Sequence, residues 1–293
     1  MYHFFASIIV KTMSRYSLLS IFKRFKWKIS ITFSMLIIEN VFKVLQPLVL
    51  GIAINDLINK SNDGLWLFCI LYAAGFFVGV IRRYYDTRAY TSIYTSVASE
   101  IANIQNQNQV SVSTIAARSS LIKELVDFFE YDITQAFTSL ISVVGALIML
   151  ALFDWWIFGA CMLTIILIFI IYTLSNHKIY NFNIGLNDEL EHRITVLEKR
   201  EHIGIVKHFK NISKWMVKLS DLETLNFGII EVILFVLAIF TLYLSASAID
   251  ATAGSIFSIV TYILEFSNGI FMLPIVFQQV IRLQEISTRL KSI

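Results

Sequence analysis

The chain has 293 residues, of which 57% are hydrophobic and 15% charged, and its mean hydropathy is +0.70. A water-soluble globular protein of ordinary composition is far less apolar, so the composition predicts an integral membrane protein. The formal net charge of +3 is too small to indicate nucleic-acid binding. Both cysteines, Cys69 and Cys161, lie within apolar runs, which favours neither a disulfide framework nor a metal site. We therefore expect an all-α membrane protein with no enzymatic activity, metal or other cofactor.

Residues 1–30 are expected to form an N-terminal interfacial segment. The first ten residues contain no Lys or Arg ahead of their apolar run, unlike a signal peptide, so we expect them to be retained. Residues 15–30 begin with Arg15 and mix Leu, Ile and Phe with four further basic residues, which is typical of a helix lying at the cytoplasmic membrane surface. A solvated basic flank is the alternative. The four further basic residues are Lys23, Arg24, Lys26 and Lys28.

Residues 31–293 are expected to form one domain of six transmembrane helices. About 20 apolar residues cross a bilayer, and six runs approach or exceed this length. The polar stretches after the second and fourth runs contain few helix breakers, so they predict long intracellular helical extensions. The spans are expected at about residues 31–54, 65–81, 133–152, 155–174, 227–248 and 255–281.

The first span carries polar residues at Glu39, Lys43 and Gln46, which is too many for lipid contact on every side. Glu39 and Lys43 are four residues apart, so they share one helix face and can neutralise each other. A structural ion pair and a role in moving substrate or protons both remain open for these residues.

The last span carries Glu265 near its middle. An ionisable group at this depth costs about 2.5–3.5 kcal/mol on insertion scales, so it usually faces a helix bundle or a wet cavity. Asn268, Gly269 and Pro274 follow, and a helix tolerates such breakers in lipid where neighbours satisfy its backbone. We expect Glu265 and Asn268 to face inward. Because desolvation disfavours the charged carboxylate, Glu265 is the first candidate for proton exchange.

Three further features of the sequence carry weaker predictions. Glu231 lies near the expected cytoplasmic end of the fifth span, where reaching the interface is the simplest explanation and a pathway role the alternative. Gly75 and Gly79 have the G-x-x-x-G spacing that lets another helix backbone approach closely. Four histidines in the second polar stretch lack the spacing of a metal site, so we assign them no function.

The basic residues predict the orientation in the membrane. Of the 24 Lys and Arg, all except Lys43 and Lys60 fall on one side of the expected topology. The positive-inside rule places this side, and both termini, in the cytoplasm. We therefore expect a multi-pass protein of the cell inner (cytoplasmic) membrane.

Six spans with long links after the second and fourth resemble the transmembrane domain of ABC exporters. The run Pro47-Leu-Val-Leu-Gly51 is similar to the P-L-x-x-G often found at the end of their first helix. Residues 201–209, EHIGIVKHF, are similar to a shortened E-x-x-x-G-I-x-x-V-K-x-F stretch between their fourth and fifth helices. The resemblance implies that two such domains pair, and that the extensions after spans 2 and 4 dock on nucleotide-binding domains.

A nucleotide-binding domain is missing from this sequence. None of its 11 glycines begins the G-x-x-x-x-G-K-[ST] loop that holds phosphates, and only 11 residues follow Arg282. We therefore expect no ATP hydrolysis by the chain itself. The layout without an ATPase resembles the SbmA/BacA peptide transporters, a family understood as proton-driven dimers, whose extra helices have no counterpart here.

Three hypotheses follow for the function. The first is a homodimeric, proton-coupled secondary transporter for amphipathic small molecules, peptides or metal chelates such as siderophores. The second is the membrane subunit of an ABC transporter with a separately encoded ATPase subunit. The third is a membrane scaffold that transports nothing. The sequence names neither the substrate nor the direction of transport, and only the lipid bilayer is common to all three as a partner.

Overall fold

Every element of the described residues is a helix. The computed structural model describes the backbone of residues 18–249 and 251–291, and their side chains except those of Phe22, Ala117 and residues 273–291. The first 17 residues of the expected interfacial segment and the side chain of Pro274 thus lie outside the described residues. The elements are α2 (Leu18–Arg24), α3 (Lys26–Ile58), α4 (Asp63–Gln107), α5 (Val112–Asp127), the π-helix η1 (Phe128–Asp132), α6 (Ile133–Phe153), α7 (Trp155–Glu191), α8 (Arg193–Glu198), α9 (His202–Ser247) and α10 (Ala253–Lys291).

Six stretches in the described residues are helical, long and apolar enough to cross a membrane, and each overlaps one of the expected spans. The second span continues without a break to Gln107, as the lack of Gly and Pro in the polar stretch after residue 81 predicts. The Asn, Gln and Ser content of residues 105–120 predicts a longer turn region, but only residues 108–111 separate α4 from α5. Ser111 ends this turn by accepting a hydrogen bond from the Thr114 backbone N–H, so it caps α5.

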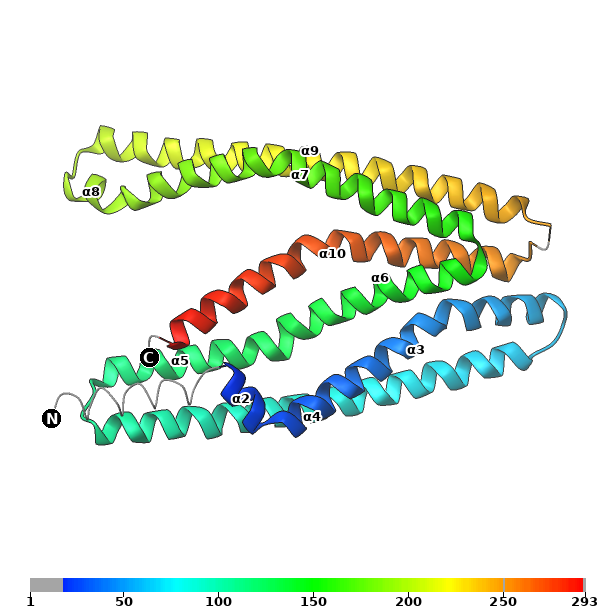
Figure 1. Ribbon diagram of the computed structural model, residues 1–293, viewed down its shortest axis with the longest axis horizontal. Helices are drawn as coiled ribbons and strands as arrows, with labels where there is room; N and C mark the ends of the chain where they lie inside the picture. The colour runs from blue at the N-terminus through cyan, green and yellow to red at the C-terminus, as the bar shows by residue number, and fades with distance from the viewer. Residues whose placement is uncertain (1–17, 250, 292–293) are drawn as a thin grey trace. The chain divides into compact units, whose positions relative to one another are not determined.

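The chain forms two compact units, which are described separately below. The first comprises Met1–Met149 and Ile249–Ile293, and the second comprises Leu150–Ala248. In the second unit α7 and α9 lie side by side and are joined through the short α8 (Figure 1). The Ser175 hydroxyl donates to the Asn226 side chain over 2.8 Å, and both residues are buried. Gly185 lies against the Trp215 ring, where a Cβ would come within 2.7 Å of the indole.

In the first unit α3 packs along α4 on one side and along α10 on the other. Asn55 near the end of α3 accepts a hydrogen bond from the Gly254 N–H near the start of α10, over 2.8 Å. Closer to the start of α3, Ser258 donates to the Pro47 carbonyl oxygen. The residue numbers rise along α10 as they fall along α3, so the two helices run antiparallel.

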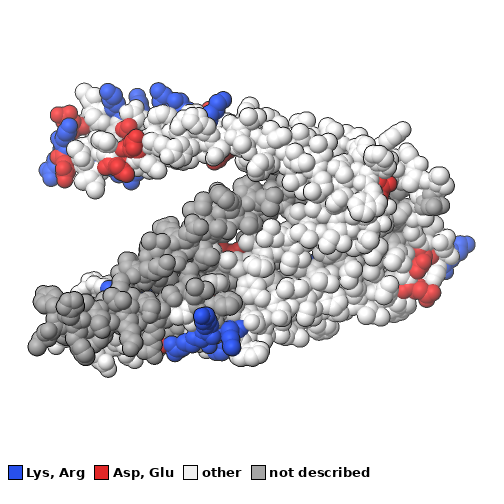
Figure 2. Space-filling view, in the orientation of Figure 1, with Lys and Arg blue, Asp and Glu red and all other residues white. Residues whose placement is uncertain are grey.

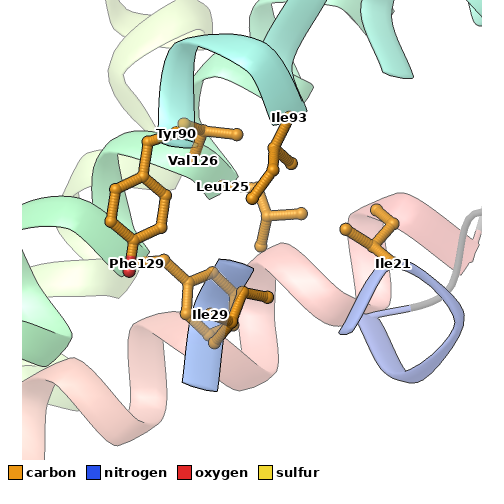
Figure 3. A pocket seen from close by; sticks show the side chains of 7 residues that line it. All are labelled: Ile21, Ile29, Tyr90, Ile93, Leu125, Val126 and Phe129. Atoms are coloured by element: carbon orange, nitrogen blue, oxygen red, sulfur yellow. The ribbon is translucent and has the colours of Figure 1, made fainter. Parts of the chain in front are cut away.

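The α4–α5 hairpin has its own apolar core, which also holds α2 and the start of α3. Tyr90, Ile122, Leu125 and Phe128 are among its fully buried members. Figure 3 shows a small apolar pocket within this core, where side chains from five elements converge. The lining residues are Ile21, Ile29, Tyr90, Ile93, Leu125, Val126 and Phe129.

The surface of each unit carries large apolar side chains that a soluble monomer would not expose in such number. On α4, Ile70, Phe76 and Phe77 are each more than half exposed. In the second unit the charged residues gather toward the end that holds α8, and the opposite half is almost free of charge in the view of Figure 2. Apolar surface of this extent is typical of helices that contact lipid.

Candidate functional site

The strongest concentration of buried charge surrounds Glu39 on α3. Glu39 is only 3% exposed, and one of its carboxylate oxygens, Oε2, accepts a hydrogen bond from Arg82 Nε on α4 over 2.5 Å. Its other oxygen, Oε1, lies 2.9 Å from Lys43 Nζ and 3.7 Å from Arg83 Nη2. The predicted pairing of Glu39 with Lys43 is thus present, and two arginines of the neighbouring helix join it.

Arg82 links this carboxylate to a second one. Its Nη1 donates to Asp86 Oδ2 over 2.6 Å, and Asp86 lies one helical turn further along α4. Arg82 and Asp86 are 8% and 4% exposed. A charged pair removed from water in this way needs hydrogen bonds to offset its desolvation, and the forked guanidinium supplies one to each carboxylate. We call Glu39, Lys43, Arg82, Arg83 and Asp86 the charge cluster.

A glycine allows α4 to approach Glu39 closely. A Cβ on Gly79 would lie 3.3 Å from Glu39 Oε1, and a Cβ on Gly75 would lie 3.0 Å from the Phe42 Cβ. Both glycines are buried. At both glycines the nearest atoms of α3 are side-chain atoms, so the spacing makes room for side chains of α3, and the Glu39 carboxylate comes within reach of Arg82.

Side chains of α10 extend this polar region from the opposite side of α3. Ser258 donates to the Pro47 carbonyl oxygen over 2.8 Å, and the Tyr262 hydroxyl donates to the Val44 carbonyl oxygen over 2.7 Å. Glu265 follows Tyr262 by three residues and lies on the same helix face. Lys43 exerts an electrostatic attraction on Glu265. Lys43 therefore acts on carboxylates of two helices.

The remaining predicted site residues have less direct connections to the charge cluster. Gln46 is partly buried, with its Nε2 atom 4.0 Å from the position of a Cβ on Gly75. Asn268 is exposed, although its neighbour Gly269 is buried against Val143 of α6. Glu231 is exposed and belongs to the second unit. The structure thus pairs Glu39 with Lys43 and places Glu265 within the electrostatic influence of Lys43.

Arg82, Arg83 and Asp86 were not predicted as site residues. The sequence places them just beyond the second apolar run, in a stretch that reads as a polar extension into water. One signal is present in the sequence, because Arg82 and Asp86 are four residues apart, as Glu39 and Lys43 are. Two such pairs on adjacent helices indicate a shared network, but only the packing of α3 on α4 shows that they meet.

A separate polar group lies in the second unit, between α7 and α9. His208 is 2% exposed, and its Nδ1 lies 2.8 Å from Glu189 Oε1. Asn211 Nδ2 also donates to this oxygen, over 3.4 Å. No group of three or more His, Cys, Asp or Glu side chains with metal-binding geometry occurs within the described residues. The Glu189–His208 contact holds the two long helices of this unit together.

The charge cluster can hold or exchange charged groups, but its residue types suit electrostatic binding better than covalent chemistry. Three cations face two carboxylates, and Glu265 supplies a third acidic group near Lys43. Lys43 and Arg83 keep 44% and 66% of their side-chain surface exposed, whereas Arg82 keeps 9%. The cluster therefore has a buried centre and two accessible cationic groups.

Comparison with known proteins was made for the whole chain. No curated protein matches it significantly. A family model described as the ABC transporter transmembrane region matches residues 18–254, from the start of α2 to the second residue of α10. Together with the six apolar helices, this match shows that the chain belongs to the family of ABC transporter transmembrane regions.

Proposed function

We propose that the chain forms the membrane-spanning half of an ABC-type transporter that works as a homodimer in the cell inner membrane. ATP is hydrolysed on a nucleotide-binding domain that lies outside these 293 residues, and the transported molecules are amphipathic. The observation that carries this proposal is the family match over residues 18–254, which includes both long helical hairpins. The chain contributes the pathway and the surfaces on which the ATPase acts.

The two hairpins support this division of labour. The α4–α5 hairpin closes at residues 108–111, and α7 connects to α9 through α8 and residues 199–201. Both turns lie far along the chain from the apolar parts of their helices. At about 1.5 Å per residue, the 45 residues of α4 measure about 68 Å, which is roughly twice the hydrocarbon thickness of a bilayer. Each hairpin can therefore reach a soluble domain.

The charge cluster supports pairing with a second copy. Lys43 and Arg83 are partly exposed on helices whose other exposed side chains are largely apolar. Charged groups at membrane depth need a wet cavity or a partner surface. A closed twofold dimer provides such a cavity between identical faces.

A proton-driven transporter is the second candidate, and Glu265 favours it. Glu265 is partly buried and makes no hydrogen bond or ion pair with any residue that the structure describes, although Lys43 attracts it. Glu39 is less suitable for proton exchange, because three cations surround its carboxylate. In this version of the mechanism Glu265 carries the proton, and Glu39 keeps its charge to hold Arg82.

The ABC-type and the proton-driven transporter differ in the energy source that drives transport. In inside-out vesicles that contain the protein with its native partners, we expect ATP to drive accumulation of dansyl-labelled amphiphiles and vanadate to block it. The panel includes cationic, neutral and anionic probes, since the substrate is not fixed by this proposal. Glu265→Gln should transport at a rate within about twofold of the wild type.

Transport that needs a pH gradient instead of ATP would favour the second candidate. In that case Glu265→Gln should lower transport at least tenfold while Glu39→Gln has a smaller effect, since Lys43 holds Glu39 ionised. Vesicles that accumulate no probe under either condition would favour a non-transporting scaffold and contradict both proposals.

A further inference from the structure

We propose that Lys43 and Arg83 bind the negatively charged group of the transported molecule, so that the substrates are amphipathic anions such as carboxylates. This inference rests on the proposed transport of amphipathic molecules and names their charge. Its structural basis is that the exposed cationic groups of Lys43 and Arg83 lie beside the Glu39 carboxylate, which already accepts a hydrogen bond from Arg82.

The two cationic groups converge on one point. Lys43 Nζ and Arg83 Nη2 lie 2.9 Å and 3.7 Å from the same atom, Glu39 Oε1. An ammonium has three N–H donors and a guanidinium has five. The Arg83 contact is longer than a hydrogen bond, and Lys43 uses one donor on Glu39. Several donors of both groups therefore remain for an incoming anion.

The charges of the cluster favour a further anion. Arg82 is buried and donates to both Glu39 and Asp86, which leaves one negative charge that Lys43 balances. Within the five residues of the charge cluster Arg83 is then the surplus cation, and Glu265 balances this charge until an incoming anion takes its place. A carboxylate that approaches from the exposed side meets Lys43 and Arg83 first and leaves the Arg82 hydrogen bonds in place.

An apolar surface continues from Arg83 along α4. Phe76, Val80 and Arg83 are spaced by four and three residues, so they lie on one helix face. Phe76 and Val80 are 58% and 45% exposed, and the Arg83 side chain is 66% exposed. A molecule with an apolar body and a terminal anion matches this order of groups: the body lies along Phe76 and Val80, and the anion lies at Arg83.

Glu265 competes with such an anion for Lys43. It faces α3 from α10, next to Tyr262, whose hydroxyl bonds to the carbonyl oxygen of the residue after Lys43. Lys43 attracts Glu265 as well as Glu39. The anion therefore gains Lys43 at the expense of Glu265, and removing the Glu265 charge should strengthen anion binding. A purely structural role of Lys43 predicts no such gain.

The test is equilibrium binding of three fluorescent probes that share one tail. The protein is reconstituted in phosphatidylcholine nanodiscs, and the probes are dansylamino-undecanoic acid, its primary amide and the corresponding amine. We expect the carboxylate to bind saturably and about tenfold more tightly than the other two, which is the gain from one hydrogen bond to a charged group. Glu265→Gln should bind it several-fold more tightly still.

Matched variants assign the site. Lys43→Gln and Arg83→Gln should each weaken carboxylate binding about tenfold, and Lys43→Arg should retain most of it. Arg88→Gln is the control, because Arg88 is an exposed arginine of the same helix that lies over the Tyr84 ring. The Arg88→Gln variant should bind the carboxylate probe as tightly as the wild type does. The Arg83 variant keeps the test valid if Lys43→Gln fails to fold, since the Arg83 side chain is exposed and its ion pair with Glu39 is long, at 3.7 Å.

Three outcomes would overturn the inference. In the first, all three probes bind equally tightly. In the second, the folded Lys43→Gln and Arg83→Gln variants bind the carboxylate probe as tightly as the wild type does. In the third, the part of the binding that these variants weaken disappears when the nanodiscs contain 30% phosphatidylglycerol. The last outcome would show that the site takes the headgroup of an anionic lipid. If ATP-driven transport of cationic or neutral probes persists in any of these cases, the proposed function stands and only the charge of the substrate is wrong.

Discussion

Arg82 is the residue on which the stability of the charge cluster depends most. It is buried, and its guanidinium donates hydrogen bonds to the carboxylates of Glu39 and Asp86 at once. Without it, Glu39 would keep Lys43, whereas Asp86 would lose the guanidinium that donates to its Oδ2. Removing one partner of a buried ion pair costs about 3–5 kcal/mol, because the remaining charge stays buried without compensation.

We predict that Arg82→Met lowers the free energy of unfolding by about this amount, roughly 3–5 kcal/mol. The measurement is unfolding in mixed micelles with rising SDS, followed by tryptophan fluorescence. Arg88→Met, on the exposed side of the same helix, should change the midpoint little. Equal midpoints for Arg82→Met and the wild type would mean that the cluster contributes no stability.

The sequence predicted part of the charge cluster, and the reason lies in the spacing of its members. Glu39 and Lys43 belong to one helix, so their contact follows from helical periodicity alone. Arg82 is 43 residues from Glu39 along the chain, so their contact depends on how α3 packs against α4. The electrostatic connection between Lys43 and Glu265 depends likewise on the packing of α10 against α3, which no local pattern contains.

At the scale of helices, the backbones of α3 and α10 approach each other closely at Gly51 and Gly254. A Cβ on Gly254 would lie 1.9 Å from the Gly51 carbonyl oxygen, and a Cβ on Gly51 would lie 2.4 Å from the Gly254 carbonyl oxygen. The carbonyl oxygens belong to helix backbones and cannot rotate away as a flexible side chain could. Even one methyl group must therefore push the two helices apart at this end.

We predict that Gly254→Ala destabilises the first unit by about 1–3 kcal/mol, the usual cost of overpacking. Gly228→Ala in α9 is the matched control, because among the described residues no atom outside the adjoining helix backbone lies within 4 Å of its added Cβ. Because Gly228 lies within a helix, its replacement by alanine should raise the free energy of unfolding by up to about 1 kcal/mol. Unfolding midpoints in SDS measure both variants, and a Gly254→Ala midpoint at or above that of Gly228→Ala would contradict the packing seen here.

The helices themselves were the part of the fold that the sequence predicted best. An apolar run of membrane length, followed by a polar stretch without proline, predicts α4 and α7 from residue types alone. The turn between α4 and α5 was placed too broadly, because the Asn, Gln and Ser of residues 105–120 are common in turns. Most of the Ser and Thr there instead lie in the first turns of α5, with Ser111 as its cap.

At the scale of the whole molecule, the helix lengths constrain the topology. The turn between α3 and α4 comprises residues 59–62, and the turn between α4 and α5 comprises residues 108–111. α4 connects them, and its apolar part permits one crossing of the bilayer. The two turns therefore lie on opposite sides of the membrane. The distribution of Lys and Arg predicts that residues 108–111 are cytoplasmic, together with both termini.

This orientation predicts which of two cysteine variants is labelled from outside the cell. In a background with Cys69→Ser and Cys161→Ala, Asn62→Cys should react with a membrane-impermeant maleimide in intact cells, and Asn108→Cys should react only after permeabilisation. Both positions are exposed, and neither side chain caps a helix, so the substitutions leave the fold unchanged. The reversed pattern would place the hairpins outside the cell, where no ATP is available to a domain that docks on them. Labelling of both variants in intact cells would contradict a single crossing by α4.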